Sequence, residues 1–172
     1  ATAVPRDGDF LLSYLRRHTP FSAIAALADC GMPVKVYGLG ERAPLGSASF
    51  HAIDERRFVD DLAACRALVG AAGNQLIGEA LQLGKPMLVL PERAHAEQQM
   101  NSHFLAGMGC GDFALVEEVT ADRIREFLAG LASYAGPLAD VVGRMDGTAD
   151  VMRVINRRLA AMAAAADAPA PE

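Results

Sequence analysis

Residues 73–101 read GNQLIGEALQLGKPMLVLPERAHAEQQMN, which is a helical pattern, an apolar strand and a second helical pattern in succession. The first helix is predicted over Leu76–Leu83 and ends at Gly84. The strand is predicted over Pro86–Leu90, where the residues after the proline are all apolar. A strand that is apolar on both faces belongs inside a parallel sheet with helices on both sides. The second helix is predicted over Ala96–Met108, so this stretch indicates an α/β protein.

The same alternation of strand and helix continues on both sides of this stretch. Further strands are predicted at Phe10–Leu15, Val34–Tyr37, Ser47–Ile53, Ala67–Val69 and Phe113–Val116, and further helices at Phe21–Asp29, Arg56–Ala64 and Ala121–Ala132. Thr19, Asp54 and Thr120 are the expected N-caps of these three helices. The pattern predicts a doubly wound, Rossmann-like parallel sheet of about six strands with helices on both faces. The strand in residues 86–90 is expected at its centre.

The 172 residues divide into one domain with short flanking segments. Residues 1–9 are polar and are expected to be flexible, and residues 10–134 form the Rossmann-like domain. Residues 135–163 are expected to form one or two helices that pack on it, and residues 164–172 a disordered tail rich in Ala and Pro. The chain begins without Met, as a piece of a longer protein would.

Composition excludes several classes of function. The formal charge is −5, from 16 basic and 21 acidic residues, with no dense basic run, which argues against a nucleic-acid partner. Apolar residues make up 52 % of the chain, but no apolar stretch is long enough to predict a transmembrane segment. Cys30, Cys65 and Cys110 form no CxxC pair and no zinc pattern with the four histidines. We therefore expect buried, reduced cysteines in a cytoplasmic protein, with no metal and no cofactor.

Two loops carry the chemistry, because ligands of such a sheet bind beyond the carboxyl ends of its strands. In the first loop, Gly73 lets the backbone turn and approach a ligand. The amides of Asn74 and Gln75 then lie at a helix N-terminus, where a diphosphate is favoured. Glu79, about one turn further on, is able to accept hydrogen bonds from the vicinal hydroxyls of a ribose. A plain strand-to-helix turn and a partly exposed helical glutamate remain the alternatives.

The second loop follows the buried strand and is unusually polar. Glu97 and Gln98 begin a helix, where their side chains suit sugar hydroxyls. His95 is a candidate for a phosphate or sugar contact, and Asn101 is expected to lock the loop by bonding to backbone groups. A solvated surface loop is the alternative.

Taken together, the spacings of these two loops resemble the donor-site signature of GT-B glycosyltransferases. The resemblance covers residues 73–101 well and Ser47–Glu118 loosely by element order. Within the GT-B enzymes, the stretch is similar to the lipid I N-acetylglucosaminyltransferase and to UDP-glycosyltransferases. It implies the C-terminal, donor-binding half of a two-domain enzyme that takes a nucleotide sugar, with UDP the expected nucleotide. The roles that it implies are ribose binding for Glu79, diphosphate binding for Gly73, Asn74 and Gln75, sugar binding for Glu97, Gln98 and His95, and base binding at Ile53.

The sequence departs from that signature at the phosphate end. Ala71 and Ala72 stand where many UDP-glycosyltransferases have a His and another residue, and Leu76 stands where a Ser or Thr often helps. The loop Ser13–Thr19 also lacks the glycines of the lipid I enzyme. Phosphate binding is therefore expected to rest on backbone amides, with Ser13, Thr19 and Arg16 as helpers.

Sugar transfer to an unknown acceptor is the leading interpretation. The resemblance implies that the catalytic base and the acceptor site come from an N-terminal domain that this chain lacks, together with any peripheral membrane contact. We therefore expect no catalytic residue here and a chain that is inactive alone. A UDP-N-acetylglucosamine 2-epimerase-like domain is an alternative, although it usually carries further acids and a basic residue around the phosphate loop. A non-catalytic assembly domain is another, and titration with UDP separates it from the binding functions.

Overall fold

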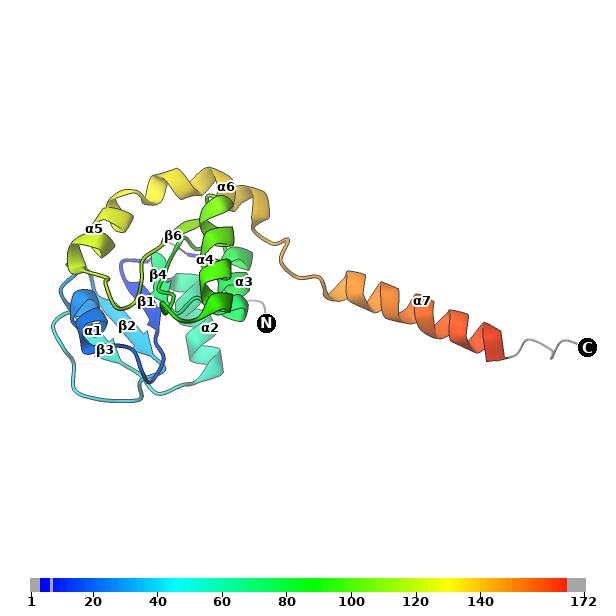
Figure 1. Cartoon of the computed structure of the whole chain (residues 1–172), viewed down its shortest axis with the longest axis horizontal. Coiled ribbons are helices and arrows are strands. Elements are labelled where there is room, and N and C mark those ends of the chain that lie inside the picture. Colours follow the sequence, from blue (N-terminus) through cyan, green and yellow to red (C-terminus); the bar gives the residue numbers. More distant parts are fainter. Residues whose placement is uncertain (1–3, 7, 167–172) are drawn as a thin grey trace, which may run out of the picture.

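The computed structural model of the chain describes residues 4–6 and 8–166. Its strands are β1 (Leu11–Tyr14), β2 (Val34–Tyr37), β3 (Ala48–Phe50), β4 (Ala67–Gly70), β5 (Met87–Val89) and β6 (Gly111–Phe113). They form one sheet in the order β3-β2-β1-β4-β5-β6, and every neighbouring pair is parallel. The chain thus runs outward twice from the centre, which confirms the doubly wound, Rossmann-like fold (Figure 1).

The buried strand of the quoted stretch is internal but not central. β5 pairs with β4 on one side and with the edge strand β6 on the other, whereas β1 and β4 occupy the centre. The predicted central position was therefore wrong. Helices cover both faces of every inner strand of the sheet. An apolar strand sequence therefore indicates that helices cover the strand on both faces, but it does not indicate where in the sheet the strand lies.

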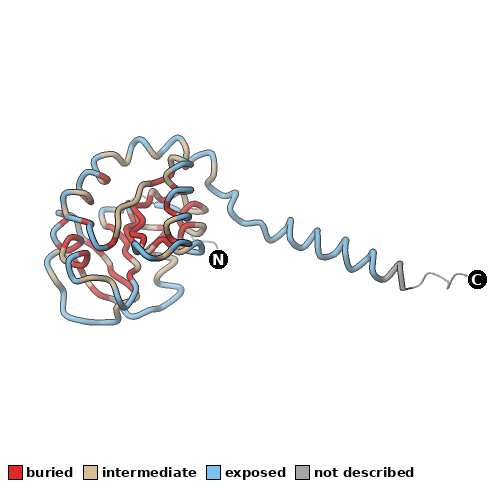
Figure 2. The backbone as a smooth tube through the Cα atoms, viewed as in Figure 1, coloured by how far each residue is buried: buried red, intermediate tan, exposed pale blue. Residues whose placement is uncertain are grey.

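Helices lie on both faces of the sheet. They are α1 (Phe21–Ala28), α2 (Glu55–Ala64), α3 (Asn74–Gln82), α4 (Ala96–Gly107), α5 (Ala121–Ala129), the 3-10 helix η1 (Leu131–Tyr134), α6 (Ala135–Val141) and α7 (Thr148–Ala166). Successive strand residues point to opposite faces. Leu11 accordingly packs in one core cluster with residues of α1 and α5, and Leu12 in another with residues of α2, α3, α4 and α6. Figure 2 shows this buried core within the sheet and the surrounding helices.

Two of the three predicted helix caps are present. The Asp54 side chain accepts a hydrogen bond from the Arg57 amide, and that of Thr120 accepts one from the Arg123 amide. Thr19 is different, because α1 begins after Pro20 and the described residues supply no side-chain cap there. The proline ring sets the backbone angle for the helix start in its place.

The segments that flank the domain differ from expectation. The amide of Arg6 donates to Ala63 O at 2.8 Å, and its carbonyl accepts from Lys85 Nζ at 2.6 Å, so part of the N-terminal segment is attached. In α6, Leu138 is buried against the domain. α7 instead projects away from it with its described side chains exposed (Figures 1 and 2). This helix also reaches residue 166, inside the predicted tail; residues 167–172 lie outside the described residues.

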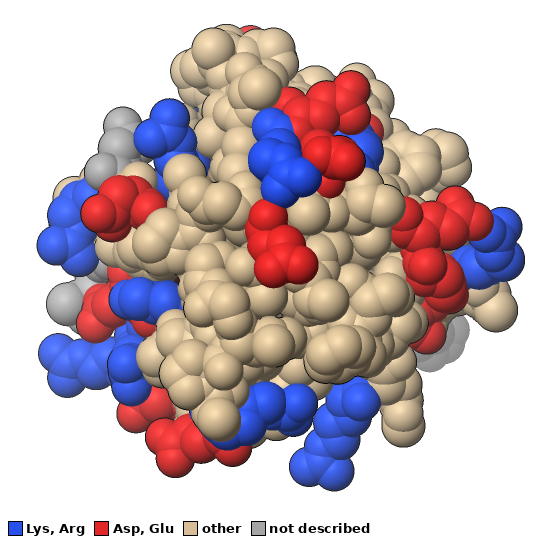
Figure 3. Space-filling model, turned by 90° about the vertical axis from the view of Figure 1, so that its left-hand side faces the viewer, with Lys and Arg blue, Asp and Glu red and all other residues tan. Residues whose placement is uncertain are grey.

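The three cysteines are buried and unpaired, as predicted, and burial raises the pKa of each thiol. On the face over α1 and α5, acidic and basic side chains are interspersed around a largely uncharged centre (Figure 3). In the described part of the chain, no helix is both long and apolar enough to cross a membrane.

Candidate functional site

A cavity of about 640 Å³ lies beyond the carboxyl ends of β1, β2 and β4 and is the candidate site. Residues at the ends of β1 and β2, in the loops after β1, β3, β4 and β5, and in helices α2, α3 and α4 line it. Its polar lining residues are Arg16, Glu55, Gln75, Glu79, His95, Glu97 and Gln98, and its apolar ones are Tyr14, Tyr37, Ile53, Phe58, Val59, Ala71, Gly73 and Leu76. The strand order reverses between β1 and β4, which is where such sheets leave a crevice.

Gly73 precedes the first turn of α3 and lines this cavity. Its φ of −77° and ψ of 136° are open to any residue, so the backbone conformation itself does not require glycine. A Cβ built at Gly73 would meet no described atom within 4 Å. The absence of a side chain therefore leaves open space in front of the α3 N-terminus. Asn74 and Gln75 follow there with exposed side chains, and Gln75 also lines the cavity.

Glu79 faces the same cavity one turn further along α3. The side-chain amide of Gln75 donates to Glu79 Oε1 at 3.0 Å. This contact joins residues four apart on one helical face and leaves the second carboxylate oxygen for another donor. The geometry suits a carboxylate that receives hydrogen bonds from a pair of hydroxyls.

The loop from β5 to α4 brings His95, Glu97 and Gln98 to the cavity. His95 is the N-cap of α4, and its Nδ1 accepts from the Gln98 amide at 3.5 Å. Glu97 lies in the first helical turn with an exposed side chain. Gln98 is only 5 % exposed, and its Oε1 accepts from the Glu92 amide at 2.9 Å. Part of the Gln98 side chain therefore fixes the loop itself.

Asn101 connects the two loops. Its Nδ2 donates to the carbonyl of Ala72 at 3.0 Å, which ties α4 to the loop between β4 and α3. The predicted backbone bond of Asn101 is thereby confirmed. It holds the loop of Gly73 at a set distance from the loop of His95.

Aromatic rings form the floor at the other end of the cavity. Phe58 meets Tyr14 and Tyr37 edge to face, with centroids 5.7 and 5.2 Å apart. His51 stacks on Tyr37 at 5.3 Å, and burial, followed by the charge of a neighbouring arginine, lowers the pKa of its imidazole. Ile53 lines the rim beside these rings and is 65 % exposed. A mostly apolar, aromatic surface of this kind suits a nucleotide base.

A buried polar triad supports this floor. Tyr37 is fully buried, and its hydroxyl donates to Asp61 Oδ2 at 2.6 Å. Lys35 Nζ donates to Asp61 Oδ1, also at 2.6 Å. Burial, with the carboxylate of Asp61 beside it, holds the pKa of Tyr37 well above its usual range. The phenol therefore stays neutral and acts as a donor.

Two of the predicted phosphate helpers lie elsewhere. Ser13 is fully buried within β1, and its hydroxyl finds no hydrogen-bond partner among the described atoms. It does not line the cavity because strand alternation points it into the core, so the expected diphosphate contact was wrong. Thr19 lines a smaller neighbouring hollow together with His18. Arg16 lines both hollows.

Sequence reasoning missed the floor of the site. The sequence predicts Tyr14 only as part of a strand and Phe58 only as part of a helix, although each is an aromatic residue near a carboxyl-edge loop. For the tyrosines, the available signal was an aromatic residue at the end of a predicted strand, as at Tyr14 and Tyr37. Among the described residues, no group of three or more His, Cys, Asp or Glu side chains is placed to hold a metal ion.

Comparisons with known proteins agree with this architecture. Residues 1–132 match the family described as Glycosyl transferase family 1. An uncharacterized glycosyltransferase from Methanosarcina acetivorans is 26 % identical over 98 residues, which are 54 % of this chain and 26 % of that protein.

Solved structures share the fold. Spinosyn forosaminyltransferase SpnP superposes with a TM-score of 0.70 and 18 % identity, over 90 % of this chain and 45 % of its own. A Medicago truncatula protein complexed with UDP-glucose superposes with a TM-score of 0.62 and 20 % identity, over 80 % of this chain and 36 % of its own. The chain thus spans less than half the length of either protein.

Proposed function

The chain belongs to glycosyl transferase family 1, and we propose that it binds the nucleotide-sugar donor, a UDP-sugar, for an enzyme completed by a second domain. The open space at Gly73 carries the proposal. Neither backbone conformation nor packing within the chain requires a glycine there, yet a side chain would fill the cavity in front of a helix N-terminus. A diphosphate is the group that such a position favours.

The proposed donor lies across the cavity from the rings to the β5–α4 loop. Its base rests near Ile53 on the floor of Tyr14, Tyr37 and Phe58, and its ribose hydroxyls meet Glu79. The diphosphate faces Gly73 and the amides of Asn74 and Gln75, and the sugar reaches Glu97, Gln98 and His95. All of these residues except Asn74 line the cavity, which supports this placement.

The proposed reaction joins an acceptor oxygen to the anomeric carbon of the sugar while UDP leaves. Helix dipoles and backbone amides offset the charge of the leaving diphosphate. We assign the base that takes the acceptor proton, and the acceptor site, to the second domain. Family membership favours transfer over the epimerase alternative.

Calorimetric titration of the chain with UDP and with uridine tests the proposal. We expect saturable binding of UDP and weaker binding of uridine, because only UDP reaches the α3 N-terminus. Failure to bind either ligand, by the chain and by the protein completed with its second domain, would favour the assembly-domain alternative.

Replacing Gly73 with alanine separates ligand contact from folding. The free energy of unfolding should change by less than about 1 kcal/mol, since alanine loses less chain entropy on folding but is a poorer N-cap than glycine. UDP binding should weaken about tenfold, as expected when one methyl group overfills a packed space. Gly78→Ala is the matched control, because a Cβ at Gly78 also meets no described atom and that residue does not line the cavity. Equal UDP affinities for the two variants would contradict the assignment.

Replacing Glu97 with alanine tests the sugar end. UDP-glucose or UDP-N-acetylglucosamine should bind about tenfold more weakly, the value of one charge-assisted hydrogen bond, while UDP affinity stays unchanged. Glu97 is exposed and can be changed alone, whereas removing Gln98 would also release the Glu92 amide. Equal losses for UDP and UDP-sugar would show that Glu97 supports the loop and does not contact the sugar.

A further inference from the structure

The cavity is poor in positive charge for a site that takes a diphosphate. Among its described lining residues, Arg16 is the only lysine or arginine, against the carboxylates of Glu55, Glu79 and Glu97. The side chains at Ala71 and Leu76 offer the phosphates no hydrogen bond. Among the described lining side chains, a diphosphate that binds here therefore has one strong cation. It lies on the loop after β1, and Arg16 and Ala71 line both the cavity and the smaller hollow beside it.

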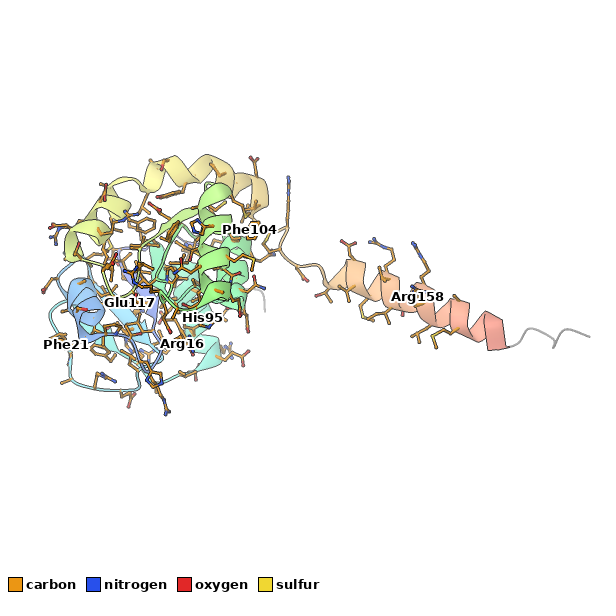
Figure 4. All side chains as sticks on the ribbon, in the orientation of Figure 1. Arg16, Phe21, His95, Phe104, Glu117 and Arg158 are labelled. Atoms are coloured by element: carbon orange, nitrogen blue, oxygen red, sulfur yellow. The ribbon has the colours of Figure 1, made fainter. Side chains whose placement is uncertain are left out.

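Arg16 is already engaged in the free protein. Its Nη1 lies 2.9 Å from Glu92 Oε1, which joins the loop after β1 to the loop after β5. The two side chains are 46 % and 40 % exposed, so water weakens their attraction and the pair is readily exchanged. Figure 4 labels Arg16 and His95, both of which line the cavity.

The backbone of Glu92 is held independently of its carboxylate. Its amide donates to Gln98 Oε1 at 2.9 Å, and its carbonyl accepts from Gln99 Nε2 at 3.1 Å. The carboxylate is thus presented to Arg16 from a fixed position. Changing Glu92 to glutamine should leave the loop in place.

We propose that Arg16 is the diphosphate-binding cation of this site and that Glu92 is its internal competitor. In the free protein the Glu92 carboxylate forms an ion pair with the Arg16 guanidinium, and the diphosphate of the donor must displace it. A guanidinium is able to bind phosphate through two parallel hydrogen bonds. In the pair with Glu92, Arg16 donates one hydrogen bond to a single carboxylate oxygen. Glu92 thereby lowers the affinity for the donor and for the diphosphate product alike. This inference rests on the proposed function.

The test is a double-mutant cycle on the chain, with UDP and uridine as ligands. Glu92→Gln should strengthen UDP binding about two- to fivefold, the range of an exposed ion pair, and leave uridine binding unchanged. Arg16→Gln should weaken UDP binding about tenfold or more, as expected for a charged hydrogen bond. In the Arg16→Gln background, Glu92→Gln should bring no further gain.

Glu118→Gln is the matched control. It removes the same charge from another exposed ion pair of this region, with Arg93, and Glu118 does not line the cavity. A gain of the same size in Glu118→Gln and Glu92→Gln would overturn the proposal, because it would reflect net charge alone. So would a gain that persists without Arg16.

The proposed function fails separately from this inference. If the wild-type chain and the completed protein bind no UDP, both fail. If UDP binds and Gly73→Ala weakens it, but the Glu92 cycle shows no coupling, the donor site stands and the competition by Glu92 is refuted.

Discussion

Replacing Glu79 with alanine is expected to weaken UDP binding by about 1.5–3 kcal/mol, roughly ten- to a hundredfold, the value of hydrogen bonds to a charged group. Glu79 lines the cavity next to the α3 N-terminus, and Gln75 holds one of its oxygens. Its free oxygen is placed to accept from a ribose hydroxyl. Folding should change little, because the apolar face of α3 (Ile77, Ala80 and Leu81) stays intact.

The measurement is calorimetry with UDP and with its 2′,3′-dideoxy analogue, which lacks the hydroxyls that Glu79 would bind. Wild type should prefer UDP, and Glu79→Ala should remove that preference. Glu55→Ala is the control, because it takes the same charge from the same cavity at the base end. If Glu79→Ala weakens both ligands equally, the carboxylate does not bind the ribose.

Replacing Asp61 with alanine is expected to lower the free energy of unfolding by about 2–3 kcal/mol. Asp61 is 9 % exposed and accepts hydrogen bonds from Lys35 and Tyr37. Its removal leaves the buried Tyr37 hydroxyl without an acceptor. Lys35 is about one-third exposed and regains water, which keeps the loss at the lower end of the range for broken buried pairs.

Urea denaturation measures this loss, with Asp60→Ala as the control on the same helix, where the side chain is exposed. Asp61→Ala should also weaken uridine binding, because Tyr37 forms part of the cavity floor. A loss of stability no greater than in Asp60→Ala would show that the triad contributes little.

Much of this site was predictable, because local sequence and topology suffice for it. Gly84 and the apolar run after it define the α3–β5 boundary through backbone conformation and burial. Once a parallel sheet is predicted, its strand-to-helix loops must meet at the carboxyl edge. From this rule we expect Glu79 and Glu97, which follow two different loops, to lie at one cavity, and both line it. The hydrogen bond of Asn101 to a backbone group was predictable on the same basis.

Side-chain direction could not be predicted in the same way. Glu97 and Gln98 are neighbours of similar chemistry, yet one is exposed and the other buried, because Gln98 is the residue whose oxygen meets the Glu92 amide. Ser13 is a polar residue near a loop, but the register of β1 turns it into the core.

The sequence by itself determined the order of elements, the parallel sheet and the edge at which the loops converge. The order follows from the local spacing of apolar residues, and the other two follow from the connection rules for alternating strands and helices. Only the tertiary structure decided the pairing of Arg16 with Glu92, 76 residues apart, and the position of Asp61 beneath Tyr37. Both pairs depend on how close two separate loops or elements come. A shift of a few ångströms breaks a hydrogen bond while leaving the pattern of buried and exposed residues unchanged.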